Sequence, residues 1–262
     1  MNPHQPKTPT ETWEDVLARN AAQSPGGIAT TLRGSNLTYG QLNEAAQRVA
    51  QLLVRLGVRP GDRVALLCPP RAEALVTFFA CCRIGAVWVG LNPKYRPPEV
   101  EYILGHAKPK ILLSVDAFDS TDYGQLLDEA SGPLAPEDRP LQLLFSPKAP
   151  TVDALIDILA RTAGSGAPVA AACIPDGNNA AMLVYTSGTT GKPKGALISE
   201  RATIFRAMNQ SAYFSTSADS RIINFSPINH VGGMQFRSLA QIYGGGTIVF
   251  QERFEPKEAL AL

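Results

Sequence analysis

The sequence predicts an α/β fold, with mostly parallel sheets flanked by helices in layers. Short apolar runs alternate with segments of helical periodicity from residue 13 to residue 115, and these runs are of the kind buried on both faces of a parallel sheet. The 22 glycines and 21 prolines among 262 residues suit a chain with many turns between short elements. Hydrophobic residues make up 45% and charged residues 18% of the chain, which is typical of a globular protein rather than a disordered one.

The N-terminal region should form a short helix, a hairpin and a longer helix. Residues 1–12 are rich in proline and are expected to be a disordered tail, whereas residues 13–20 read as a helix. The β-rich run 28–33 resumes at Leu37 after a Gly-Ser-Asn turn, which predicts a hairpin. Thr38 and Gln41 have capping-box spacing, and apolar residues then recur every three or four positions. This pattern predicts an amphipathic helix that begins after Thr38 and ends at Gly57.

The central region alternates strands and helices at short intervals. Strands are expected at residues 63–68, 86–91 and 110–115, with helices at 72–83 and 97–104. Such an order needs crossover connections, so the sheet should be parallel with helices on both faces. The signal weakens after residue 116, where 123–130 and 152–162 read as helices and 141–145 reads as a strand.

Charge, hydropathy and cysteine content exclude several classes of function. The 24 Lys and Arg residues balance 23 Asp and Glu residues, which argues against nucleic acid as a partner, because binding phosphates needs clustered positive charge. No apolar stretch reaches the length of a membrane span, and the N-terminus lacks the apolar core of a signal peptide. The four cysteines form neither a CxxC pair nor a disulfide framework. We therefore expect a cytoplasmic protein with reduced, buried thiols.

The segment TSGTTGKPKG, residues 186–195, carries the strongest chemical signal. It contains three glycines, four hydroxyl residues and two lysines, and it follows a predicted strand at residues 181–185. Glycine lets successive N–H groups converge on an anion, and the hydroxyl and ammonium groups add donors and charge, which suits a triphosphate. The alternative is a flexible linker. The strand before the segment, the strand-like residues 196–198 and the helical pattern from Ser199 favour a phosphate loop.

Two other phosphate-binding patterns do not fit this segment. A Walker A loop needs Gly-Lys five places after its first glycine, but Pro193 stands five places after Gly188. The dinucleotide pattern needs a second glycine where Thr190 stands.

The segment resembles the signature of the adenylate-forming superfamily, which includes acyl- and aryl-CoA synthetases, luciferases and the adenylation domains of peptide synthetases. Further similarity lies in TYGQLNEAA (38–46), GVRPGDRVALL (57–67), GAVWVGLNP (85–93), PINHVGG (227–233) and GGTIVFQERFEP (245–256). The likeness therefore covers nearly all of the chain from residue 13. It is most like the N-terminal part of an acyl-CoA synthetase.

The resemblance implies an organisation and a reaction. Residues 13–262 would be an incomplete N-terminal AMP-binding domain, with a first α/β subdomain at about 13–180 and the start of a second, with its own sheet and the phosphate loop, at about 181–262. Family members join a carboxylic acid to ATP, release pyrophosphate, and transfer the acyl group from the adenylate to coenzyme A. The implied cofactors and partners are ATP, Mg²⁺, coenzyme A and a small carboxylic acid, with a homodimer as a possible assembly.

The resemblance also assigns roles to individual residues. Lys194 would follow the leaving pyrophosphate and His230 would position the substrate carboxylate, so these two are the candidate catalytic residues. The expected nucleotide contacts come from Thr186, Ser187, Gly188, Thr189, Thr190, Gly191 and Lys194. The expected substrate contacts come from Asn229, His230, Gly232 and Gly233. No metal ligand is predicted. A histidine without such a motif is more often structural, and His106, at a helix end, is given no functional context.

The sequence also bears on the substrate class. No Asp or Glu lies between Arg221 and Gln251, whereas amino-acid-activating relatives usually hold an aspartate there, which favours an acid without an α-amine. Gly244, Gly245 and Gly246 fit a plain turn or space for an acyl chain equally well. Glu200 replaces a histidine that many relatives have, and at a helix start a carboxylate is expected to be harmless.

Family chains continue well beyond the fourth motif, whereas this sequence ends at Leu262. We therefore expect an N-terminal part that is inactive alone. The alternative is a non-catalytic nucleotide- or acyl-binding module derived by truncation.

Overall fold

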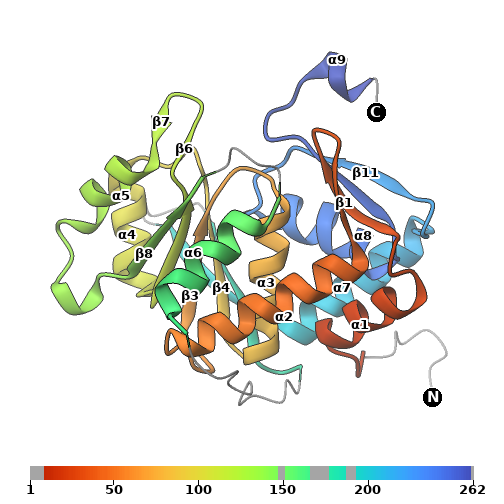
Figure 1. Ribbon diagram of the computed structural model, residues 1–262, viewed down its shortest axis with the longest axis horizontal. Coiled ribbons are helices and arrows are strands. Elements are labelled where there is room, and N and C mark those ends of the chain that lie inside the picture. The colour runs from red at the N-terminus through yellow and green to blue at the C-terminus, as the bar shows by residue number, and fades with distance from the viewer. Residues whose placement is uncertain (1–8, 147–150, 166–176, 187–192, 261–262) are drawn as a thin grey trace.

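The computed structural model describes residues 9–146, 151–165, 177–186 and 193–260. Two larger sheets lie side by side, with β3, β4 and β8 in one and β1 and β11 in the other (Figure 1). Helices flank both sheets, which confirms the predicted layered α/β architecture. Among the described residues, no helix is long and apolar enough to span a membrane.

The six-stranded sheet has the order β10-β9-β4-β3-β5-β8. Its members are β3 (Arg63–Leu67), β4 (Val87–Leu91), β5 (Ile111–Val115), β8 (Leu141–Phe145), β9 (Ala180–Thr186) and β10 (Lys194–Ser199). All neighbours are parallel except β10, which runs antiparallel to β9. The central strands are buried along their length, as their apolar sequences predict.

The four-stranded sheet has the order β11-β12-β1-β2 and joins the two ends of the described chain. It contains β1 (Ile28–Leu32), β2 (Ser35–Thr38), β11 (Arg221–Asn224) and β12 (Thr247–Phe250). The predicted hairpin is present as β1 and β2, and β1 also pairs in parallel with β12. A separate small hairpin consists of β6 (Ala117–Phe118) and β7 (Thr121–Asp122).

The expectation of a new sheet starting near residue 181 is wrong. β9 pairs with β4, and β10 pairs with β9, so both strands extend the first sheet. The second sheet instead recruits β1 and β2 from the N-terminus. A local pattern shows that a segment is a strand, but its partner depends on which other buried edge is available, and neighbours in sequence are often not neighbours in a sheet.

Helices α1 to α7 agree closely with the sequence patterns, whereas α8 was not predicted. They are α1 (Trp13–Gln23), α2 (Tyr39–Arg55), α3 (Ala72–Ile84), α4 (Pro97–Ala107), α5 (Tyr123–Ser131), α6 (Asp153–Ala163), α7 (Glu200–Tyr213), α8 (Ala240–Tyr243) and α9 (Pro256–Ala259), with a 3₁₀ turn η1 (Pro136–Asp138). The Thr38 side chain accepts from the Gln41 N–H and the Gln41 side chain accepts from the Thr38 N–H, which confirms the capping box. Gly85 ends α3 with φ 66°, a left-handed conformation that suits glycine.

The segment Gly232–Leu239, labelled η2, is π-helical and leads directly into α8. The sequence did not predict this geometry, because π-helical hydrogen bonding has no simple apolar period.

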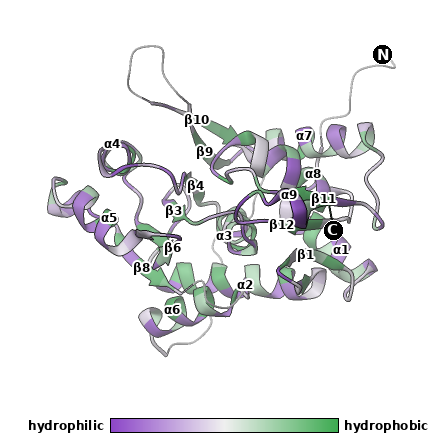
Figure 2. Cartoon of the chain, turned by 90° about the horizontal axis from the view of Figure 1, so that it is seen from above, coloured by the Kyte–Doolittle hydropathy of each residue, from purple (hydrophilic) through white to green (hydrophobic). Residues whose placement is uncertain are grey.

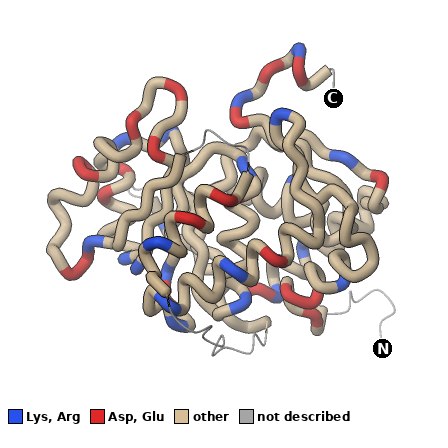
Figure 3. The backbone as a smooth tube through the Cα atoms, viewed as in Figure 1, with Lys and Arg blue, Asp and Glu red and all other residues tan. Residues whose placement is uncertain are grey.

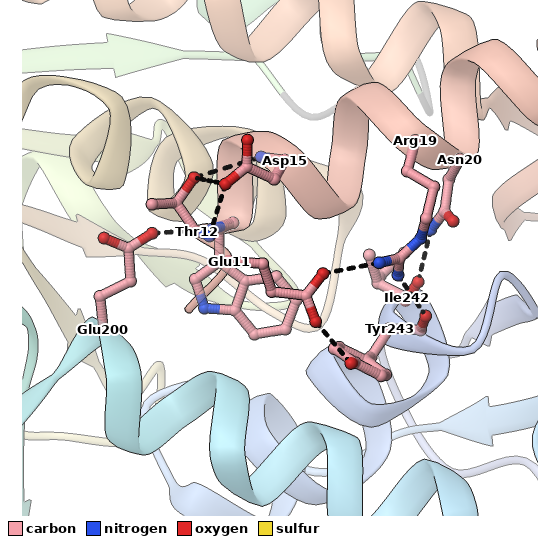
Figure 4. Close-up of polar contacts among 9 residues, drawn as sticks. Glu11, Thr12, Asp15, Arg19, Asn20, Glu200, Ile242 and Tyr243 are labelled. Atoms are coloured by element: carbon pink, nitrogen blue, oxygen red, sulfur yellow. Dashed lines mark hydrogen bonds and ion pairs between the residues drawn. The ribbon is translucent and has the colours of Figure 1, made fainter. Parts of the chain in front are cut away.

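Side-chain contacts hold the start of α1 in place, so the ordered part of the chain begins no later than Glu11. Thr12 and Asp15 form a capping box at the first turn. The Glu11 carboxylate lies 2.6 Å from Arg19 and accepts from the Tyr243 hydroxyl at 2.5 Å (Figure 4). The prediction that residues 1–12 are a disordered tail is therefore wrong for Glu11 and Thr12. A proline-rich composition does not reveal the tertiary contacts that these two residues make.

α1 also contacts two helices from the second half of the chain, α7 and α8. The Trp13 N–H donates to Glu200 at 2.8 Å, and its indole N–H donates to Thr203 at 2.8 Å. Asn20 donates to the Ile242 carbonyl at 2.7 Å (Figure 4). These bonds fix α1 against α7 and α8.

A buried ionic network joins the two sheets. Arg71, just before α3, contacts Glu73 at 2.9 Å and Glu252, just after β12, at 2.8 Å. Arg33, in the turn between β1 and β2, contacts the second oxygen of Glu252 at 2.7 Å. Burial raises the pKa of Glu73, against the opposing effect of Arg71. Arg33 is exposed, but removing Arg71 would leave the buried carboxylates of Glu73 and Glu252 without their buried partner, so this arginine helps to fix how the sheets meet.

Candidate functional site

The segment with the strongest chemical signal begins at the carboxyl edge of the six-stranded sheet. β9 is parallel to β4 and ends at Thr186, so it opens onto the edge where β3, β4 and β5 also end. β10 returns from this edge beside β9, and Figure 2 shows β10, β9, β4 and β3 in succession. Ligands of α/β proteins bind outside the carboxyl ends of the strands. The predicted phosphate loop is therefore attached at the favoured place.

Thr186 and Lys194 face each other at the mouth of this hairpin. They are partners in the antiparallel register, and the Thr186 hydroxyl lies 3.5 Å from the Lys194 carbonyl oxygen. Both residues are exposed, so a hydroxyl group and an ammonium group face solvent at this edge. The other predicted nucleotide contacts lie outside the described residues: Ser187, Gly188, Thr189, Thr190 and Gly191.

The fourth-motif segment packs directly on the strand next to β9. A Cβ atom added to Gly90 of β4 would lie 2.7 Å from the Asn229 Cα. Val89, the residue before Gly90, pairs with Leu183 of β9. Glycine at position 90 therefore lets the 227–233 turn approach the sheet, a requirement that the sequence did not reveal.

Asn229 presents an unsatisfied acceptor at this junction. Its side chain is 7% exposed, and its Oδ1 atom is buried without a hydrogen-bond partner among the described residues. Because buried polar atoms in folded proteins nearly always have partners, this oxygen is an acceptor that the described residues leave unsatisfied.

His230 is exposed and is oriented by its own turn. Its Nδ1 accepts from the Gly232 N–H at 3.1 Å. An accepting Nδ1 leaves the neutral ring with its proton on Nε2, which is a hydrogen-bond donor. The nearby Gly233 has a packing role, because an added Cβ would lie 2.4 Å from the Pro227 carbonyl oxygen. The structure thus gives the two predicted glycines a role in shaping the turn that carries Asn229 and His230.

The sequence assigned no role to two residues that contact the hairpin, Tyr102 and His106. The Tyr102 hydroxyl donates to the Pro193 carbonyl at 3.0 Å, and His106 Nδ1 lies 2.7 Å from the Tyr185 hydroxyl. Burial raises the pKa of Tyr185 to about 12, so its hydroxyl stays protonated at neutral pH. The four-residue spacing of Tyr102 and His106 indicates a shared helix face, but only the tertiary structure shows what that face touches.

The larger cavities do not coincide with the predicted polar residues. One of about 770 Å³ lies between the sheets and is lined by Asn92, Pro227 and Glu252 among others. Another of about 880 Å³ lies between α7 and η2 and is largely apolar, with Phe205, Phe214 and Phe236 in its wall. Neither lining includes Lys194, Asn229 or His230.

Charge and metal-binding capacity are unremarkable over the described chain. Acidic and basic residues are interspersed along the backbone (Figure 3). Within the described ranges, no group of three or more His, Cys, Asp or Glu side chains is placed to hold a metal ion.

Comparisons with known proteins agree on one family. Residues 17–262 match the family described as AMP-binding enzyme. The chain is 30% identical over 248 residues to a feruloyl-CoA synthase of Amycolatopsis sp, covering 93% of this chain and 44% of that protein. It is 32% identical over 250 residues to an indoleacetate–CoA ligase of Aromatoleum aromaticum, covering 93% and 45%. Phosphinothricin tripeptide synthetase PhsC of Streptomyces viridochromogenes is 31% identical over 262 residues, with 95% and 21% covered.

Solved structures give the same result. ATP-bound MatB from Rhodopseudomonas palustris superimposes with a TM-score of 0.77 at 29% identity, covering 95% of this chain and 47% of that one. The inhibitor-bound N-terminal domain of FACL13 from Mycobacterium tuberculosis has a TM-score of 0.77 at 26% identity, covering 96% and 60%. The chain therefore spans about half the length of the curated CoA ligases it matches.

Proposed function

The chain belongs to the AMP-binding enzyme family, and on this premise we propose that it takes part in ATP-dependent activation of a carboxylic acid for transfer to coenzyme A. The carboxylate oxygen attacks the α-phosphorus of ATP and pyrophosphate leaves, which gives an acyl-adenylate. The thiol sulfur of coenzyme A then attacks the acyl carbon, and AMP leaves.

The observation that carries the proposal is the hairpin at the carboxyl edge, where Thr186 and Lys194 face each other. An anionic carboxylate must approach a tetra-anionic triphosphate, so catalysis depends on positioning and on neutralising charge as pyrophosphate departs. The Lys194 ammonium group supplies that charge, and the Thr186 hydroxyl donates to a phosphate oxygen. By resemblance, residues 187–191 complete the phosphate contacts.

The acid is held on the neighbouring turn. The Nε2–H of His230 donates a hydrogen bond to the substrate carboxylate. The Asn229 Oδ1, which has no partner among the described residues, accepts a hydrogen bond from a donor group of the bound substrates. Gly232 and Gly233 contribute by allowing the tight turn that carries Asn229 and His230. Magnesium would accompany the triphosphate, because Mg²⁺ is usually bound through substrate phosphates together with one or two carboxylates.

The substrate class is an aryl or fatty acid without an α-amine. The stretch from Arg221 to Gln251 contains no carboxylate that could pair with an ammonium group, and two of the relatives are named for feruloyl and indoleacetyl groups. A cytoplasmic location is part of the proposal, supported by three free and buried thiols at Cys68, Cys81 and Cys82.

The test is ATP–pyrophosphate exchange by the protein as its gene encodes it, with ferulate, indoleacetate, a fatty acid and an amino acid as substrates. We expect exchange with one or more of the first three acids and none with the amino acid. Lys194→Ala should lower the exchange rate by about 10²–10³-fold, the usual effect of losing one group that stabilises transition-state charge. The control is Lys257→Ala, which removes an exposed lysine on α9.

Each other outcome is informative. Exchange with the amino acid alone would overturn the substrate class. Calorimetric binding of magnesium-ATP without exchange of any acid would favour a non-catalytic binding module. Absence of both binding and exchange would refute the proposed function.

A further inference from the structure

One face of α4 contacts both strands of the β9–β10 hairpin, at the end where Thr186 and Lys194 pair. Tyr102 and His106 are four residues apart on this helix and so lie on the same face. The Tyr102 hydroxyl donates to the carbonyl of Pro193, and His106 Nδ1 bonds to the hydroxyl of Tyr185. Pro193 immediately precedes Lys194, and Tyr185 immediately precedes Thr186. Each contact is thus one residue away from a side chain to which a phosphate-binding role is proposed.

The rings of Tyr102, His106 and Tyr185 form a cluster of aromatic contacts. Tyr102 and His106 are nearly parallel, with centroids 5.9 Å apart and planes at 19°, and His106 meets Tyr185 edge to face at 5.7 Å and 80°. Tyr185 is buried in the core, which anchors the cluster to the sheet. A phenol both donates and accepts, so the bond to Tyr185 persists whether or not the imidazole is protonated.

The contact to Pro193 stabilises a point where the strand ladder ends. The outermost pair of the β9–β10 ladder is Thr186 with Lys194, and Pro193 lies beyond it. Proline has no N–H, so its carbonyl is its only backbone hydrogen-bonding group. Tyr102 bonds this carbonyl, and this holds the β10 end of the hairpin against α4.

Core packing accounts only in part for this face of α4. The fully buried residues of α4 are Val100, Ile103, Leu104 and Ala107. Tyr102 is half-buried and packs against the edge of the core, whereas His106 is exposed. Their hydrogen bonds, and the contact of the His106 ring with Tyr185, are directed to the hairpin.

We propose that Tyr102 and His106 are positioning residues that hold Thr186 and Lys194 in the geometry needed to bind the triphosphate. The inference rests on the proposed function, and it adds two residues outside the signature segment. It follows from the sensitivity of transfer reactions to placement, where a displacement of about 1 Å costs about 100-fold in rate.

The kinetic test uses Tyr102→Phe, His106→Ala and His106→Asn in the protein that performs exchange. Tyr102→Phe and His106→Ala should lower kcat/KM for ATP by about 10–100-fold, with KM for the acid unchanged. His106→Asn places an amide near the position of Nδ1, so it should restore the rate to within about threefold of the wild-type protein, as expected if the hydrogen bond is what matters. The matched control is Tyr123→Phe, which removes a tyrosine hydroxyl bond to the Pro93 carbonyl, also of 3.0 Å.

A second measurement does not depend on activity. Hydrogen–deuterium exchange in residues 194–199 should be faster in Tyr102→Phe and His106→Ala than in the wild-type protein, and unchanged in Tyr123→Phe. Exchange in residues 141–145 of β8, at the other edge of the sheet, should be unaffected in all variants.

The outcomes separate the two proposals. An active wild-type protein whose Tyr102 and His106 variants match Tyr123→Phe in both measurements overturns the positioning role alone. A wild-type protein that neither binds magnesium-ATP nor performs exchange overturns the proposed function and the positioning role with it.

Discussion

Replacing Glu200 by alanine should release the start of α1 from α7. Glu200 is the first residue of α7, is 2% exposed, and accepts the Trp13 N–H at 2.8 Å. Trp13 is fully buried, and its indole N–H is bonded to Thr203. The sequence suggested only that a carboxylate is tolerated at this helix start. The structure shows that it is a buried tether.

The magnitude follows from the contacts that are lost. An unsatisfied buried N–H at Trp13 costs about 1–3 kcal/mol. Removing one buried methylene group costs about 0.8 kcal/mol, and losing a negative charge at a helix N-terminus costs about 0.3–1 kcal/mol. Release of a desolvated carboxylate offsets part of this. We therefore expect Glu200→Ala to lower the free energy of unfolding by about 3 kcal/mol, and Glu200→Gln, which keeps an acceptor, by about 1 kcal/mol.

Urea unfolding followed by tryptophan fluorescence measures this directly, because both tryptophans, Trp13 and Trp88, are buried. With an m-value of about 3 kcal/mol per M, Glu200→Ala should lower the midpoint by about 1 M. The control is Glu14→Ala on α1, which removes a 46% exposed partner of Arg83 and should cost less than about 1 kcal/mol. A Glu200→Ala midpoint equal to that of Glu14→Ala would show that the tether contributes no stability.

Three further predictions concern thiols, alkaline stability and the fourth-motif turn. Burial raises the pKa values of the thiols of Cys68, Cys81 and Cys82. These thiols should therefore react with a disulfide reagent only after denaturation. Rapid labelling of more than one thiol per native chain would contradict the structure. Burial also raises the pKa of three phenols to about 12: Tyr123, Tyr185 and Tyr243. The pKa of a tyrosine in the unfolded chain is about 10. The contribution of the three buried phenols to stability is therefore complete below pH 10 and is lost between about pH 10 and 12. A urea midpoint that rose over this interval would contradict their burial. Gly233→Ala should destabilise the chain by about 1–3 kcal/mol, since its new Cβ would lie 2.4 Å from a backbone oxygen of Pro227, whereas Gly26→Ala, with open space around it, should be near neutral in the same urea assay.

Local elements were predictable because their causes are local. The capping box at Thr38, the stop at Gly85 and the strand Leu141–Phe145 each depend on a few adjacent residues. The prediction that residues 186–195 bind an anion also has local causes, since glycine, hydroxyl and lysine at close spacing are suited to anions wherever the chain places them. That assignment stays a prediction.

Contacts between distant segments were not predictable. The parallel pairing of β1 with β12 joins residues more than 200 positions apart, and nothing in either strand specifies the other. The same is true of the bond between Trp13 and Glu200 and of the network that links Arg71 with Glu252. Each requires knowing which surfaces meet.

The amino-acid order by itself determined the layered α/β class and most helix and strand positions as far as residue 199, because dihedral preference and apolar period act over a few residues. It also predicts that the segment after Tyr185 binds an anion, from side-chain chemistry at close spacing. Only the tertiary structure decided that β9 and β10 extend the first sheet, that Asn229 lies on β4 through the gap left by Gly90, and that Tyr102 and His106 reach the hairpin. These follow from the burial of whole faces against one another, a condition that no single segment of the chain can satisfy alone.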